Sequence, residues 1–287
     1  MPVKASALGA KVDGRTVEAT PRRLLAYAAG LGATDAIYMD DAAPGGIVAV
    51  PAFVVSLEWP VMGSDAYRAA LGINAGERLK GVHVLQDSRF RRAIRPGDKL
   101  STEGQIVSIR PTGAGAFVIA KLTTVDAGGT LVAESFYGSI FRGVATDGGG
   151  GAIEEVPPLR AEAEVPGPGR ATDRFKIAPE LPHVYTECAA IWNPIHTERA
   201  VARAAGLPDI ILHGTATWAL ACLAAIKAHG EGDPTRLRRF AGRFDAMVLP
   251  RTTIAIDHKR LDPRKVAVAV RTADDKFALS SGIAEIG

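Results

Sequence analysis

The sequence predicts an α+β fold made of two similar halves, and three observations support this prediction. Helix-forming segments come before a run of strand-forming segments in the first half, and the second half repeats that order. A stretch rich in Gly, Pro and Glu separates the halves, and short motifs recur between them at a constant offset. Helices followed by consecutive strands favour antiparallel sheets packed on helices and argue against a doubly wound parallel sheet.

The first half opens with a predicted helix over residues 20–32. Thr20 precedes the apolar run and suits the N-cap, Pro21 suits the first helical position, and Gly30 ends the pattern. After an acidic turn, the apolar residues 47–50 are predicted to form a strand.

A second, apolar helix is predicted to begin at Pro51 and to run through Met62. Beyond residue 82 the pattern changes to strands separated by turns rich in Gly, Pro and Asp. The predicted strands are residues 82–90, 99–109, 115–125 and 130–141.

The segment at 145–170 is too rich in Gly, Pro and Glu to bury a core, so it is predicted to be a linker, flexible in part and stiffened in part by proline. The expected organisation is therefore a first domain at 1–144, the linker at 145–170 and a second domain at 171–287.

A weak internal repeat supports a duplicated half. Arg89 to Pro96 matches Arg243 to Pro250 at a constant offset, although identity is limited to Arg-Phe and Pro, and chance is the alternative. Each half is then expected to be a helix laid on an antiparallel sheet. The two sheets could pair edge to edge, which would cover strand edges that otherwise stay exposed.

Bulk composition excludes several functional classes. A formal net charge of +3, with 23% charged and 47% hydrophobic residues, gives no basic stripe of the kind that nucleic-acid-binding proteins carry. Cys188 and Cys222 are too few for a metal cluster or a disulfide framework, which indicates a reducing cytoplasm. The N-terminus lacks the apolar run of a signal peptide and no segment suits a membrane span. We therefore expect no cofactor, metal, nucleic-acid partner or membrane partner.

The residues suited to chemistry lie in the second half. Asn193-Pro194-Ile195-His196 forms a polar turn in apolar surroundings, and Leu212-His213-Gly214 opens a long apolar helix. A helix start presents unpaired N–H groups and a positive dipole end, which suit the developing charge on a carbonyl oxygen. A histidine beside such a helix start predicts a protein that acts on a carbonyl compound.

With these motifs on helix-and-sheet halves, the chain resembles the MaoC-like dehydratase family, and within it the (R)-specific 2-enoyl-CoA hydratases. The resemblance implies a double hot-dog fold, a non-catalytic first half that accommodates the acyl chain, and an acyl-CoA or acyl-carrier thioester of fatty acid metabolism as substrate. It implies that His196 is the catalytic histidine, Asn193 the motif asparagine and Gly214 the oxyanion donor. A homodimer is also expected.

The family signature runs Gly-Asp-x-Asn-Pro-(Ile/Leu)-His, and its Gly-Asp pair falls here on Ala190-Ile191. Ile191 cannot exchange a proton, although general acid–base catalysis is worth roughly 10²–10⁴ in rate. His196 could act alone, or a carboxylate from elsewhere could replace the Asp, with Glu58 on the first-half helix the preferred candidate. Alternatively, the protein is a non-hydrating acyl-CoA-binding protein or an inactive subunit of a hydratase complex. A thioesterase is a third option.

Structural roles compete with functional ones at several other residues. His213 is expected to shape the turn beside Gly214, and Cys188 is expected to lie in the core on an apolar strand. Trp192 could line an acyl pocket or pack the turn. The remaining histidines are expected to be structural; they are His83, His183, His229 and His258.

Overall fold

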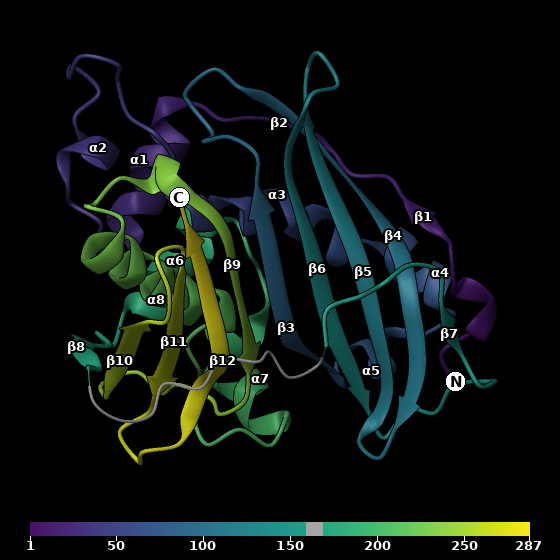
Figure 1. Cartoon of the computed structure of the whole chain (residues 1–287). Coiled ribbons are helices and arrows are strands. Elements are labelled where there is room, and N and C mark those ends of the chain that lie inside the picture. The colour runs from purple at the N-terminus through teal and green to yellow at the C-terminus, as the bar shows by residue number, and fades with distance from the viewer. Residues whose placement is uncertain (159–168) are drawn as a thin grey trace.

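The structure is a computed structural model that describes residues 1–158 and 169–287. A 12-stranded antiparallel sheet runs through the molecule in the order β1-β4-β5-β6-β3-β9-β12-β11-β10-β8, with β2 and β7 paired to β4. Figure 1 shows the helices gathered behind this sheet. The predicted α+β class is therefore confirmed.

The first half has five α-helices and seven strands within the described residues. The helices are α1 (Pro21–Gly30), α2 (Ala36–Met39), α3 (Val54–Met62), α4 (Asp65–Leu71) and α5 (Ala75–Arg78), with 3-10 turns η1 (Ala5–Ala7) and η2 (Pro51–Phe53). The strands are β1 (Lys11–Val12), β2 (Thr16–Glu18), β3 (Gly81–Phe90), β4 (Lys99–Thr112), β5 (Gly115–Asp126), β6 (Leu131–Arg142) and β7 (Gly151–Ala152). The four predicted long strands are confirmed, and so is the predicted cap of α1, because the Thr20 side chain accepts the Arg23 N–H at 3.4 Å.

The strand predicted at 47–50 is wrong. These residues are buried and lie outside any strand. The Val48 N–H donates to the Ile37 carbonyl at 3.0 Å and the Ala49 N–H to the Ile94 carbonyl at 2.9 Å. The segment is apolar because it crosses the core. Its N–H groups bond to isolated carbonyls rather than to the regular row of carbonyls on a neighbouring strand.

The second half repeats the order of the first. Its helices are α6 (Leu181–Ala189), α7 (Arg199–Ala204) and α8 (Gly214–His229), with 3-10 turns η3 (Pro194–His196) and η4 (Pro234–Arg236). Its strands are β8 (Ala171–Lys176), β9 (Leu237–Phe244), β10 (Thr253–Arg260), β11 (Lys265–Arg271) and β12 (Phe277–Ile286). The strand expected around Cys188 is wrong, since this segment is α6, with Pro182 in its first turn and with Leu181, Tyr185 and Ala189 buried at helical spacing.

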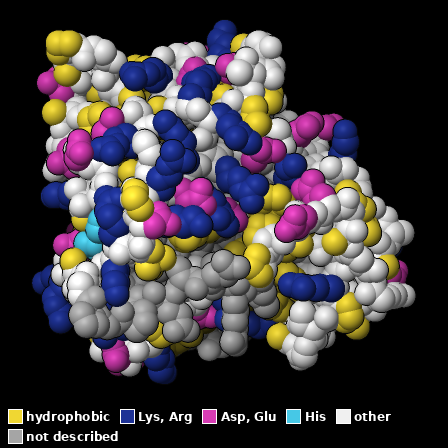
Figure 2. Space-filling model, in the orientation of Figure 1, with side chains coloured by type: hydrophobic (Ala, Val, Ile, Leu, Met, Phe, Trp, Pro, Cys, Tyr) yellow, Lys and Arg dark blue, Asp and Glu magenta, His cyan; other side chains and the backbone are white. Residues whose placement is uncertain are grey.

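The two halves meet edge to edge, as predicted, where β3 pairs with β9 from Leu85↔Arg243 to Arg89↔Arg239. A buried ion pair crosses this seam, because Arg239 binds both carboxylate oxygens of Asp87 at 2.8 and 2.7 Å. Figure 2 shows Lys and Arg interspersed with Asp and Glu over this side of the molecule, so the visible charge does not form a stripe of one sign.

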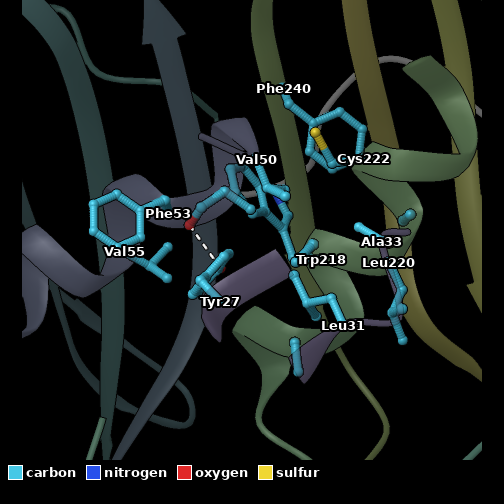
Figure 3. Packing of buried hydrophobic residues seen from close by; sticks show 14 of the residues in the cluster. Tyr27, Leu31, Ala33, Val50, Phe53, Val55, Trp218, Leu220, Cys222 and Phe240 are labelled. Atoms are coloured by element: carbon cyan, nitrogen blue, oxygen red, sulfur yellow. Dashed lines mark hydrogen bonds between the residues drawn. The ribbon is translucent and has the colours of Figure 1, made fainter. Parts of the chain in front are cut away.

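Helices from both halves share one apolar core on the other face of the sheet. Tyr27 of α1 and Trp218 of α8 are among its fully buried side chains. Figure 3 shows them packed with Phe53 and Phe240 between the two halves. The halves are therefore one hydrophobic unit.

The connection between the halves runs from the end of β6 to the start of β8. The predicted linker at 145–170 contains the short strand β7, and its residues 159–168 lie outside the described residues. Among the helices of the described parts of the chain, none is both long and apolar enough to cross a membrane.

Candidate active site

The helix α6 ends in a left-handed turn that sets the start of the motif loop. Ala190 has a φ of 54°, and the Ile191 N–H donates to the Thr186 carbonyl at 3.1 Å. A left-handed conformation costs a non-glycine residue about 1–2 kcal/mol. Ile191 is 5% exposed. Its side chain therefore lies in the core.

The following turn fixes the orientation of His196. The Asn193 side chain accepts the Ile195 N–H at 3.4 Å and so caps η3. The Nδ1 atom of His196 lies 2.8 Å from the Ile211 carbonyl oxygen. Because a carbonyl oxygen can only accept, Nδ1 carries the proton and Nε2 of the neutral ring is left with its lone pair.

Burial keeps the His196 ring neutral. The side chain is 8% exposed, and desolvation lowers its pKa from 6.5 to about 4. No residue of the described chain hydrogen-bonds to Nε2. His196 is therefore a neutral base at physiological pH, and once protonated it is a stronger acid than an ordinary histidine.

His213 lies against His196 and ties the loop to α8. The two rings stack with centroids 3.6 Å apart. His213 Nε2 lies 3.2 Å from the Thr186 hydroxyl and 3.3 Å from the Ile191 carbonyl, and burial lowers its pKa. Thr186 already donates to the Pro182 carbonyl, so Nε2 of His213 is the donor to both oxygens. Its buried Nδ1 has no hydrogen-bond partner in the described chain.

The first turn of α8 offers two unpaired donors beside these histidines. The Ala216 and Thr217 N–H groups both donate to the His213 carbonyl. The N–H groups of Gly214 and Thr215 make no hydrogen bond within the described residues. A Cβ at Gly214 would lie 3.1 Å from the Phe244 ring, so glycine permits this close packing. Two N–H groups at the positive end of a 16-residue helix suit an oxyanion.

A tyrosine pair joins the halves beneath this site, and sequence reasoning assigned it no role. Tyr27 donates to the Ala52 carbonyl at 2.8 Å, and its hydroxyl lies 3.2 Å from that of Tyr185. The Tyr185 ring is 5.0 Å from that of His213. Burial raises the pKa of Tyr185 to about 12, so its hydroxyl stays neutral. The available signal is that each tyrosine lies in the first long helix of its half, Tyr27 in α1 and Tyr185 in α6.

Glu58 lies in the first half and faces the sheet. Its Oε2 accepts from Gln86 at 3.0 Å, and Gln86 also donates to Ser88 at 2.8 Å. Burial raises the Glu58 pKa to about 7. Its Oε1 has no partner in the described chain. No hydrogen bond or ion pair of the described residues joins Glu58, or any other carboxylate, to His196.

Other candidate residues lie away from the site. Trp192 is 59% exposed and donates to Glu187 at 3.3 Å, so it points outward from the loop. His229, His258 and Asp173 form a separate hydrogen-bonded chain near the far end of α8. Within the described residues, no group of three or more His, Cys, Asp or Glu side chains is arranged to hold a metal ion.

Sequence comparison assigns dehydratase families to both halves. Residues 6–135 match the FAS1-like, dehydratase domain region, and residues 163–276 match the MaoC like domain. A probable enoyl-CoA hydratase 2 of Dictyostelium discoideum is 25% identical over 207 residues, which are 71% of this chain and 69% of that protein. The 3-hydroxyacyl-thioester dehydratase Y of Mycobacterium tuberculosis is 26% identical over 283 residues, 95% of this chain and 93% of that protein.

Solved structures agree on the fold. A MaoC-like dehydratase from Phytophthora capsici superimposes with a TM-score of 0.87 at 22% identity, covering 99% of this chain and 97% of that one. A Mycobacterium tuberculosis protein described as having a double hotdog fold superimposes with a TM-score of 0.64 at 16% identity, covering 97% and 95%. These likenesses confirm the predicted double hot dog. The chain therefore carries a FAS1-like dehydratase region in its first half and a MaoC-like domain in its second, and as a whole it is similar to MaoC-like dehydratases.

Proposed function

We propose that this protein is a hydro-lyase that interconverts an enoyl thioester and its 3-hydroxyacyl thioester. One observation carries the proposal: the neutral His196 ring stacks on His213, which directly precedes the two unpaired N–H groups at the head of α8. A base and an oxyanion site in one small region are what addition of water to an α,β-unsaturated thioester requires. The relatives named as enoyl-CoA hydratase and 3-hydroxyacyl-thioester dehydratase support the same reaction.

The proposed hydration uses His196 for both proton transfers. Nε2 accepts a proton from water while the water oxygen bonds to C3 of the enoyl group, and the C2–C3 π electrons move to the thioester oxygen. The Gly214 and Thr215 N–H groups stabilise the enolate that forms. His196 then returns the proton to C2, and its low pKa favours this step. Dehydration follows the same path in reverse.

The proposal assigns no proton transfer to residue 191. Ile191 contributes packing, and its carbonyl accepts from His213, which keeps the stacked ring in place. Glu58, the candidate substitute acid, takes no part in these proton transfers, because no hydrogen bond of the described residues joins it to His196. Burial raises its pKa to about 7, so it exchanges a proton near neutrality within the first half. We propose coenzyme A or a carrier protein as the thiol of the substrate.

An assay of the hydration of crotonyl-CoA and longer enoyl-CoAs tests the proposal. The reaction is monitored as the loss of the enoyl thioester's ultraviolet absorbance. His196→Ala should reduce kcat by roughly 10²–10⁴. His229→Ala is the matched control, since His229 lies at the other end of α8 and bonds to His258. Equal inactivity of the wild type and His196→Ala across the panel would refute a hydratase.

A second candidate function is acyl-thioester binding without hydration, and the buried Ile191 favours it. Isothermal titration with a saturated acyl-CoA, together with turnover by Ile191→Asp, separates the two functions. Binding by the wild type with turnover appearing only in Ile191→Asp would support the binding protein. Turnover by the wild type would eliminate it, and release of free thiol from a saturated acyl-CoA would instead indicate a thioesterase.

A further inference from the structure

The turn that follows α1 in the first half has the same backbone path as the candidate catalytic turn after α6. Gly32, two residues after the end of α1, and Ala190, directly after α6, are both in the left-handed region, with φ of 67° and 54°. The next residues, Ala33 and Ile191, each donate an N–H to a carbonyl of the preceding helix at 3.0 and 3.1 Å. The first half therefore contains a structural counterpart of the site.

The correspondence extends along the backbone of the turn. The Tyr38 N–H donates to the Asp35 carbonyl at 2.9 Å, as the His196 N–H donates to that of Asn193 at 3.1 Å. Tyr38 thus holds the place of His196, and Asp35 that of Asn193. Tyr38 is 2% exposed, and its hydroxyl has no hydrogen-bond partner in the described chain.

A cavity of about 230 Å³ lies beside this first-half turn. It is lined by Leu31, Ala33 and Tyr38 of the first half and by Leu220 and Leu223 of α8. Figure 3 shows Leu31, Ala33 and Leu220 grouped at one end of the shared core. At roughly 30 Å³ for each group of the size of a water molecule, the cavity holds a chain of about eight such groups.

Charged side chains lie at this cavity as well. Arg174 of β8 and Lys227 of α8 line it and are exposed. None of the ion pairs among the described residues involves either cation. Asp35 and Asp173 also line it, but Asp173 is bonded to His258 at 3.1 Å. Cations without partners beside an apolar wall complement an amphipathic anion.

We propose that this cavity is a second ligand site, which binds a linear fatty carboxylate of about eight to ten carbons. The hydrocarbon chain lies between Leu31 and Leu223, and the carboxylate meets Arg174 and Lys227. No chemistry occurs there, because Tyr38 replaces the histidine and is kept neutral by burial. The site is separate from the His196 loop and does not depend on the hydration reaction.

Isothermal titration of the whole protein with decanoate tests this site. Ala224→Trp, which places an indole in the cavity, should abolish binding. Ala228→Trp is the matched control, because Ala228 is exposed on the same helix and does not line the cavity. Lys227→Glu, at an exposed position that folding tolerates, should weaken binding at least about tenfold.

The outcomes are distinct from those of the hydratase assay. Binding of one equivalent to the wild type and to Ala228→Trp, with loss in Ala224→Trp and weakening in Lys227→Glu, supports the site. No binding to the wild type overturns it. Binding that is unchanged in both Ala224→Trp and Lys227→Glu also overturns it and places decanoate elsewhere.

Discussion

The ion pair between Asp87 and Arg239, across the seam between β3 and β9, is expected to contribute to the unfolding free energy. Asp87 is 0% exposed, and both of its oxygens accept from Arg239, at 2.8 and 2.7 Å. Replacing Arg239 by Met keeps the aliphatic packing but leaves a buried carboxylate without a cation. Loss of one partner from such a pair costs about 3–5 kcal/mol of unfolding free energy.

The converse change should cost less, because Arg239 has a second partner. Its guanidinium also reaches Glu285 at 3.1 Å, and its side chain is 24% exposed. Asp87→Leu therefore leaves Arg239 paired and hydrated. The double variant Asp87→Leu with Arg239→Met should recover most of the loss, since no buried charge remains.

Equilibrium unfolding in urea measures these free energies. Arg91→Met is the matched control, because Arg91 pairs with Glu134 at 3.2 Å but its side chain is 58% exposed. Such a pair is worth about 0–1 kcal/mol. If Arg239→Met destabilises the protein no more than Arg91→Met does, the ion pair does not hold the seam and this reasoning is wrong.

Three further predictions concern the candidate site. Thr215→Pro removes one N–H donor at a helix position that tolerates proline, so kcat for hydration should fall by about 10²–10³. The control is Ala66→Pro, at the second position of α4, which should leave kcat unchanged. Ala190→Gly relieves the left-handed φ of 54° and should raise the unfolding free energy by about 1 kcal/mol in urea titrations; a decrease would contradict the strain. The pKa of His196 is lowered from 6.5 to about 4 in the folded protein, so as pH falls this histidine is protonated first in the unfolded chain. The unfolding free energy is therefore highest above pH 6.5 and decreases as pH falls toward 4. This loss is about 2 kcal/mol at pH 5, and His196→Asn should flatten the measured pH dependence by that amount.

Local patterns in the sequence predicted the features that depend on neighbouring residues. Turns rich in Gly, Pro and Asp marked the ends of the four long strands, and Thr20 marked the cap of α1. The segment at 47–50 was misread because a buried apolar run looks the same in a strand and in a core-crossing loop. Around Cys188, residues with strand propensity were overridden by the packing of α6 against α1.

The candidate site was predictable only as far as its motif extends. The turn that contains Asn193 and His196 lies against the residues that precede α8, because His196 bonds to the Ile211 carbonyl and stacks on His213. The contact between Tyr27 and Tyr185 joins residues of opposite halves, which no local pattern encodes. The direction in which Glu58 points depends on Gln86, which lies on a different element, so spacing along α3 could not reveal it.

The seam also bears on how the chain reaches its fold. β3 and β9 pair directly, yet the rest of the first-half sheet and the linker separate them in sequence. Hairpins such as β4 with β5 require only short loop closures, whereas the seam requires a long one. We therefore expect each half to assemble its own strands early, and β3 and β9 to join late. Until they join, each half presents an open strand edge to solvent, and this is the period in which the chain is most exposed to pairing with other copies.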